Sequence, residues 1–190
     1  MVQELDPANA SDDSMEANAV FIERSASLLV GEWSFYHQGD ENNCAIYRAP
    51  FVVRAPSEPC VGVAYWIGAL SDGNIAPDAP LGSYIAFCDV MIARCSFFEA
   101  KYAFTVSAFR GLGLHRKLIE SALQEMPIVS DAVGMRRKAY DTWMRLQGVE
   151  RGWFDTTSGT FCGEHEVPEY ERFRNDSLGD RWRLVLHPAK

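Results

Sequence analysis

The stretch Phe104-Thr-Val-Ser-Ala-Phe-Arg-Gly-Leu-Gly-Leu-His-Arg-Lys-Leu-Ile119 joins a strand-like segment to a helix-like one through a loop with two glycines. Residues 97–106 are rich in aromatic and β-branched side chains, and apolar residues recur at helical spacing in 115–124. A glycine loop at a helix start directs backbone N–H groups and the helix dipole at an anion. The pattern predicts a phosphate-binding loop, with a plain glycine turn capped by basic residues as the alternative.

Two better-known phosphate loops do not fit these residues. No Gly-Lys-Ser/Thr follows the glycines, so the stretch is not a P-loop. The pattern Gly-x-Gly-x-x-Gly is incomplete, and the preceding strands are expected to be antiparallel, which argues against a dinucleotide fingerprint.

The rest of the chain predicts an α+β fold. Residues 1–13 are expected to form an acidic flexible arm, and an amphipathic helix is expected from Ser14 to about Gly31. An antiparallel meander then follows, with a loop at 74–81 and strands at 33–37, 44–54, 61–69, 83–93 and 97–106. After the helix at 115–124 come a strand at 127–133, a helix at 134–146 and closing strands at 149–155 and 182–187. The aromatic residues of the first strands are mostly expected in the core, some of them lining a cleft: Trp33, Phe35, Tyr36, Tyr47, Phe51, Tyr65 and Trp66.

Charge and composition bound the function. The chain has 190 residues, of which 47% are hydrophobic, and this is sufficient for one globular domain. Its net charge is −8. Residues 1–100 carry 4 bases and 14 acids, whereas residues 101–190 carry 14 bases and 12 acids. An acidic whole argues against nonspecific binding to nucleic acid or a membrane surface, but it allows a local basic pocket.

Cysteine usage and hydropathy suggest a cytoplasmic protein. The five cysteines are scattered without a Cys-x-x-Cys pair, which predicts reduced thiols. The longest apolar stretches, such as 60–70, are too short to span a membrane, and the acidic start is unlike a signal peptide. Cys162-Gly-Glu-His165 has no partner pair and is expected to be a loop, so no metal site is predicted.

Residues 106–119 resemble motif A of the GNAT acetyltransferases, a family that transfers an acetyl group from acetyl-CoA to an amine. The family signature is Arg/Gln-x-x-Gly-x-Gly/Ala before a helix with paired leucines. Arg110-Gly-Leu-Gly113-Leu-His115 matches at Arg110 and Gly113, and Leu118-Ile119 stand where the leucine pair is expected. His115 departs from the signature. A slipped register that begins at Ala108 keeps both glycines and loses the leucine pair.

The downstream segment resembles the same family. Ala139-Tyr-Asp-Thr-Trp143-Met-Arg-Leu146-Gln-Gly148-Val149 is similar to the family's helix and following turn, with Trp143 in place of Tyr and Val149 in place of Phe. The resemblance covers about residues 85–155. The form Val129-Ser130-Asp131 with Trp143-x-x-Leu146 also looks similar to acetyltransferase-like proteins carried by bacteriophages and mobile elements. It implies a single GNAT-like domain over 14–190, with a mixed, mostly antiparallel sheet flanked by helices.

The resemblance also implies a cosubstrate, acetyl-CoA, on the side formed by residues 101–190, where the net charge of +2 supports it. The backbone near the strand end would hold the pantetheine arm, and the loop would hold the pyrophosphate. The implied cofactor-binding residues are Phe104, Thr105, Val106, Arg110, Gly111, Leu112, Gly113, Leu114, His115 and Trp143.

The implied reaction is direct attack of an amine on the thioester. Glu99, on the strand before the loop, is the candidate base, with a solvated strand-edge acid as its alternative. Tyr140, one helical turn before Trp143, is the candidate acid, with an aromatic core residue as its alternative. Arg136-Arg137-Lys138 either reach the 3′-phosphate or coat an exposed helix face, and the exposed face is preferred.

The sequence is consistent with two functions from different classes. The first is an N-acetyltransferase, with residues 14–100 binding an amine-bearing small molecule or protein; the mild acidity there, including Asp89, suits a cationic amine. The second is a catalytically degenerate GNAT-like phage or mobile-element protein that binds another protein. Neither needs a membrane, nucleic acid enters only as a tRNA-linked substrate, and a homodimer is left open.

Overall fold

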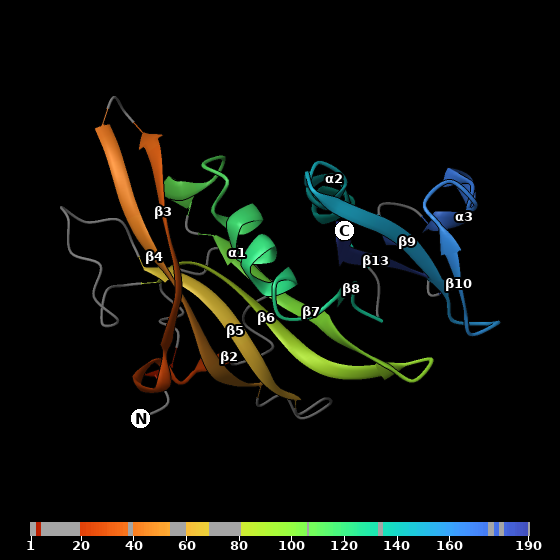
Figure 1. Ribbon diagram of the computed structural model, residues 1–190, viewed down its shortest axis with the longest axis horizontal. Coiled ribbons are helices and arrows are strands. Elements are labelled where there is room, and N and C mark those ends of the chain that lie inside the picture. Colours follow the sequence, from red (N-terminus) through yellow and green to blue (C-terminus); the bar gives the residue numbers. More distant parts are fainter. Residues whose placement is uncertain are drawn as a thin grey trace. The chain divides into compact units, whose positions relative to one another are not determined.

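The computed structural model describes residues 3–4, 20–37, 40–53, 60–68, 81–105, 107–132, 135–174, 177–178 and 181–189. They belong to two compact units (Figure 1). Unit 1 comprises Met1–Cys88 and Tyr102–Ser121, and unit 2 comprises Asp89–Lys101 and Ala122–Lys190. Both contain strands and helices, so the α+β class is confirmed.

An antiparallel meander forms most of unit 1. The strands pair in the order β1-β2-β4-β5-β6-β7, and β3 also pairs with β4. Their bounds are β1 Gln3–Glu4, β2 Val20–Ile22, β3 Leu28–His37, β4 Asp40–Val53, β5 Cys60–Gly68, β6 Leu81–Ile92 and β7 Cys95–Thr105. The last two strands continue into unit 2. The predicted meander is confirmed, and Gln3–Glu4 of the predicted arm pair with Phe21 and Ile22.

The core of unit 1 is built by alternation along the strands. Tyr47 of β4 stacks on Trp66 of β5 with ring centroids 4.6 Å apart, and Tyr84 of β6 lies near Phe104 of β7. Trp66 donates its indole N–H to Ser27 Oγ at 3.1 Å, which brings the segment before β3 to this core. Because side chains alternate across a strand, one face of the meander collects these rings.

The helix expected over 14–31 is wrong in its described part. Residues from Val20 onwards form β2, a 3₁₀ turn at Arg24–Ala26 and the start of β3. Ile22 is buried, whereas Leu29 of the same helical stripe is 57% exposed, so these apolar residues share no buried face. Pairing with β4 supplies the backbone hydrogen bonds instead, and tertiary contacts override the weak helical period.

Unit 2 contains a mixed sheet in the order β7-β8-β13-β9-β10. Its elements are β8 Ile128–Val129, α2 Arg137–Met144, β9 Val149–Asp155, β10 Thr160–Gly163, α3 Glu169–Arg172 and β13 Trp182–Pro188, with the small hairpin β11 Phe173–Arg174 and β12 Ser177–Leu178. β7 and β8 are parallel, and β13 lies antiparallel between β8 and β9. The predicted strand-helix-strand order is confirmed, but the strand at 127–133 is only two residues long.

The sequence interpretation missed β10, although a local signal precedes it. Asp155 accepts hydrogen bonds from the backbone N–H groups of Thr157 and Ser158, and Gly159 follows with φ +71°. Arg181 pairs with Asp155 at 2.8 Å and lowers the pKa of its carboxyl. An Asp-capped turn ending in glycine is a hairpin signal, and β10 folds back on β9 from it.

The structure bears on two predictions, the reduced state of the cysteines and the lack of a membrane-spanning segment. Cys88 is disulfide-bonded, while Cys44, Cys95 and Cys162 are free, so the prediction of reduced thiols is wrong for Cys88. Strand pairing brings together residues far apart in sequence, which cysteine spacing cannot show. No helix among the described residues is long and apolar enough to cross a membrane.

A substitution at Gly62 tests the close packing between the strands of the meander. A Cβ atom there would lie 1.9 Å from the Phe87 carbonyl oxygen and 2.8 Å from Phe51 Cε1. Gly62→Ala should therefore lower the free energy of unfolding by roughly 1–3 kcal/mol or more. Gly31→Ala is the matched control, since nothing lies within 4 Å of its Cβ position, and should change it by less than about 0.5 kcal/mol. Urea denaturation of both variants measures the difference; equal losses would contradict this packing.

Candidate functional site

The predicted phosphate loop lies entirely in unit 1, between β7 and α1 (Leu114–Leu123). A 3₁₀ turn at Ser107–Phe109 leads into it. Gly111 and Gly113 both have positive φ, 85° and 83°, which non-glycine residues rarely adopt. Helix α1 then begins at Leu114, and its first N–H groups have no partner within the helix. The strand, glycine loop and helix therefore follow one another as predicted.

The end of β7 is held by hydrogen bonds. Ser83, fully buried on β6, donates to the Phe104 carbonyl at 3.0 Å, and its Oγ lies 2.8 Å from Thr105 Oγ1. Arg110 Nε donates to the Thr105 carbonyl at 3.1 Å. These bonds fix the strand end against the loop. Val106, the third residue predicted to face pantetheine, lies outside the described residues.

The basic side chains at the start of α1 are paired with a carboxylate. Glu120 accepts from Arg116 Nε at 2.7 Å and from Lys117 Nζ at 2.8 Å. Burial raises the pKa of Glu120, but the two cations outweigh it and hold the pKa below its ordinary value. Unit 1 as a whole has 13 acidic and 6 basic residues. The loop therefore lies in the acidic unit, so the +2 counted over 101–190 does not describe its surroundings.

His115 occupies the second position of α1. Burial lowers the pKa of its imidazole to about 4, from an ordinary value of 6.5. The side chain is therefore uncharged at neutral pH. His115 can exchange hydrogen bonds with a ligand, but it adds no positive charge to the loop.

Trp33 of β3 lies beside the glycine loop, an arrangement that the sequence interpretation missed. Its Cη2 atom is 3.7 Å from the position of a Cβ at Gly113. Phe35 stacks on the indole with centroids 4.7 Å apart, and Lys117 Nζ lies 5.7 Å from its centroid. Strand spacing placed Trp33 among residues of the core or the cleft. No sequence signal linked it to a loop 80 residues away, because a tertiary contact makes that link.

Glu99, the candidate base, lies in unit 2 within a buried ion network. Its Oε1 atom accepts from Arg183 Nη2 at 2.6 Å and from the Ala132 backbone N–H at 2.9 Å. Lys101 lies 3.2 Å from its Oε2 and 3.0 Å from Asp131. Burial lowers the pKa of Lys101, but Asp131 and Glu99 outweigh it and raise the pKa. Glu99 is 5% exposed, which differs from the alternative of a solvated strand-edge acid.

The same network ends β8 early. Arg183 Nε and Nη2 both donate to the Ser130 carbonyl, at 2.9 and 2.6 Å. The Ser130 backbone N–H bonds to the Leu184 carbonyl at 2.8 Å, and its hydroxyl accepts from the Leu184 N–H at 3.0 Å. Residues after Val129 therefore turn to β13 and its side chains, which explains why the strand expected to reach residue 133 stops.

Tyr140, the candidate acid, is also in unit 2 and is 6% exposed. Arg172 Nη1 donates to its hydroxyl at 3.3 Å, and its ring packs edge-on against Phe173 with centroids 4.7 Å apart. Arg172 also donates to the Glu164 and Val167 carbonyls. Trp143, three residues further on α2, is 1% exposed. Both side chains belong to the core of this unit.

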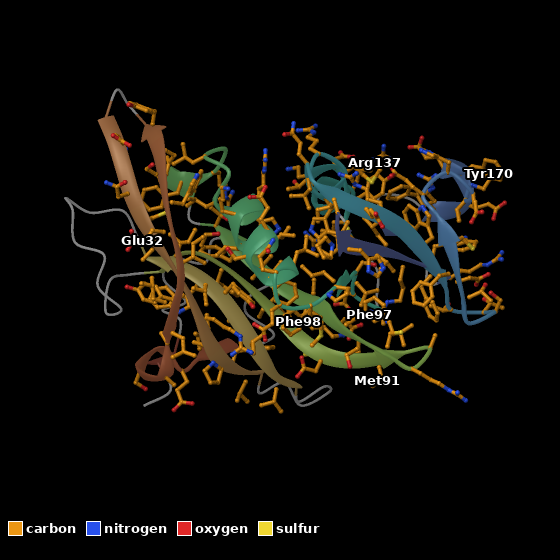
Figure 2. The ribbon with its side chains drawn as sticks, viewed as in Figure 1. Glu32, Met91, Phe97, Phe98, Arg137 and Tyr170 are labelled. Carbon is orange, nitrogen blue, oxygen red and sulfur yellow. The ribbon has the colours of Figure 1, made fainter. Side chains whose placement is uncertain are left out.

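The basic run at the start of α2 coats an exposed face. Arg137 forms ion pairs with Asp141 and Glu169, each at 3.1 Å, and Figure 2 shows it on α2, with Tyr170 on α3. Arg136 and Lys138 are exposed as well. Among the described residues, no three His, Cys, Asp or Glu side chains form a metal-binding group. The loop expected at 162–165 is wrong for Cys162, which pairs with Trp153 as part of β10, whereas His165 lies in the turn that follows this strand.

The structure therefore divides the predicted site residues. Unit 1 holds Phe104, Thr105 and the loop from Arg110 to His115, whereas unit 2 holds Glu99, Tyr140 and Trp143. Within unit 1, Trp33 and Ser83 join the loop and the strand end. Within unit 2, Glu99 and Tyr140 are each bound to an arginine, Arg183 and Arg172.

The Glu99–Arg183 pair can be tested by one chemical change made at two places. Glu99→Gln should lower the free energy of unfolding by about 3 kcal/mol, because it leaves the buried Arg183 guanidinium without its carboxylate. Glu120→Gln removes a carboxylate from a more exposed pair and should cost below about 1 kcal/mol. Thermal and urea unfolding measure both. Equal losses would show that the buried pair does not hold this unit together.

Comparison with models of known families, with curated proteins and with solved structures finds no match to this chain.

Proposed function

We propose that this chain is an N-acetyltransferase of the GNAT type, which transfers an acetyl group from acetyl-CoA to an amine. The observation that carries the proposal is the loop between β7 and α1. Its two glycines have positive φ and are followed at once by a helix of 10 residues. This local geometry suits the pyrophosphate of a CoA thioester, because the first N–H groups of a helix have no partner within the helix and can bind an anion.

The residues present fit such a ligand at the loop. A Cβ at Gly111 would meet nothing within 4 Å, so the loop is open on that side. Leu114, His115 and Arg116 supply the first N–H groups of α1, and the Phe104–Thr105 backbone lies at the strand end before the loop. In this proposal the loop binds pyrophosphate and the strand end orients the pantetheine arm.

The reaction would rely on positioning. A neutral amine attacks the thioester carbonyl, the C–N bond forms, the C–S bond breaks, and the amine's proton leaves through water or a side chain while the thiolate departs. Backbone N–H groups would stabilise the oxyanion. Glu99 and Tyr140 keep their proposed roles as base and acid only if each leaves its arginine, so water relay is the preferred proton route.

Acetyl-CoA binding tests the loop. Isothermal titration should show saturable binding by the wild type and at least a tenfold weaker affinity for Gly113→Asp, because the variant places a carboxylate and backbone strain at φ +83°. Gly159→Asp is the matched control, since Gly159 has φ +71° and lies in the β9–β10 turn. It should bind like the wild type. Absence of binding by the wild type would overturn the proposed function.

A second candidate is a GNAT-like protein that binds another protein without catalysis. The observation that favours it is the engagement of both candidate catalytic groups, Glu99 with Arg183 and Tyr140 with Arg172. In this case the two contacts stabilise the fold, and neither Glu99 nor Tyr140 is available to move the amine's proton.

Thiol release separates the two candidates. If the chain is an acetyltransferase, purified protein with acetyl-CoA and a panel of polyamines, aminoglycosides and lysine peptides should release free CoA thiol with at least one amine. Tyr140→Phe, which removes only the hydroxyl, should then retain most of the activity if water carries the proton. Acetyl-CoA binding without thiol release from any amine would favour the non-catalytic candidate.

A further inference from the structure

The glycine loop has little unpaired positive charge near it for a site that would bind a polyanion. Arg116 and Lys117 share Glu120, His115 is uncharged at neutral pH, and Arg110 Nε is bonded to the Thr105 carbonyl. The surrounding unit is acidic in composition. Side-chain charge alone is therefore a poor basis for selecting a CoA thioester, and another contact has to supply the selectivity.

The aromatic side chain beside the loop is Trp33. It reaches the loop from β3, with Cη2 at 3.7 Å from the Cβ position of Gly113, and Phe35 stacks on it. The other four tryptophans of the chain, Trp66, Trp143, Trp153 and Trp182, are between 0% and 6% exposed. Trp33 is partly exposed, so it is the one tryptophan with surface available to a ligand.

Position and exposure together indicate a contact role. A large aromatic side chain left partly exposed next to a phosphate-type loop offers apolar area that a bound ligand can cover. The residue has support in that place, because the Phe35 stack and the strand pairing of β3 with β4 hold the indole. A rigid ring loses little conformational entropy when a ligand covers it.

We propose that Trp33 is the specificity-determining residue of the glycine-loop site. Its indole, rather than the basic side chains of α1, provides the principal side-chain contact to the ligand. The ligand class is an acyl thioester whose carrier contains a nucleotide, as in acetyl-CoA. This inference rests on the proposed function and adds the part of the site that comes from the first half of the chain. It follows that the site selects for the organic portion of the ligand and binds inorganic pyrophosphate weakly.

Two binding experiments test the assignment. In calorimetry, Trp33→Leu should bind acetyl-CoA at least tenfold more weakly than the wild type, and Trp33→Phe should recover most of that loss. Arg116→Gln should change the affinity by less than about threefold, since the Arg116 guanidinium already faces Glu120. Inorganic pyrophosphate should bind the wild type at least a hundredfold more weakly than acetyl-CoA does.

A fluorescence measurement on the wild type avoids the risk that Trp33→Leu unfolds β3. Acetyl-CoA should quench the tryptophan emission and protect it from acrylamide. In Trp33→Phe the remaining emission comes from buried tryptophans, so acetyl-CoA should leave it unchanged although calorimetry still detects binding.

The outcomes separate this inference from the proposed function. If the wild type does not bind acetyl-CoA, both fail. If it binds but Trp33→Leu binds equally well, or if the quench persists in Trp33→Phe, the proposed function stands and the assignment of Trp33 is overturned. A loss of affinity larger in Arg116→Gln than in Trp33→Leu would also overturn it, in favour of recognition by charge.

Discussion

The Glu99–Arg183 ion pair is the constraint on which the arrangement of unit 2 depends. It ties β7 to β13 across β8, and through the Ser130 carbonyl and the Ala132 N–H it also sets where β8 ends. Buried charges are tolerated only when they are paired and hydrogen-bonded. Burial lowers the pKa of Arg183, and the neighbouring carboxylates of Glu99 and Asp131 oppose that effect.

Ion pairing also determines the charge of the glycine loop, but here it leaves fewer cations available to a ligand. At the start of α1, Arg116 and Lys117 form ion pairs with Glu120 on the same helix, and these pairs offset their positive charge. What is left for a ligand is the backbone: two glycines that turn the chain and the first N–H groups of the helix. In the proposed site, shape and the neighbouring aromatic surface of Trp33 on β3 would therefore supply the remaining contacts to the ligand.

Local patterns predicted most of the elements and few of the contacts. The meander, α1, β9 and β13 were predictable because their periods and glycine punctuation are strong, and the glycine loop has the conformation that its residues require. The helix expected from Ser14 failed because its apolar stripe is also compatible with strands, and pairing with β4 decided the matter. The partners of Glu99 and Tyr140 are 84 and 32 residues away in sequence, beyond any periodicity.

The place of β13 in the sheet has a consequence for how the chain is made. Residues 182–188 lie between β8 and β9, which are synthesised earlier. Before β13 is synthesised, the edges of β8 and β9 that pair with it have no partner strand. Arg183 arrives with the same strand, so Glu99 also waits for its counter-charge. These unpaired edges leave the nascent chain open to aggregation until β13 has been synthesised.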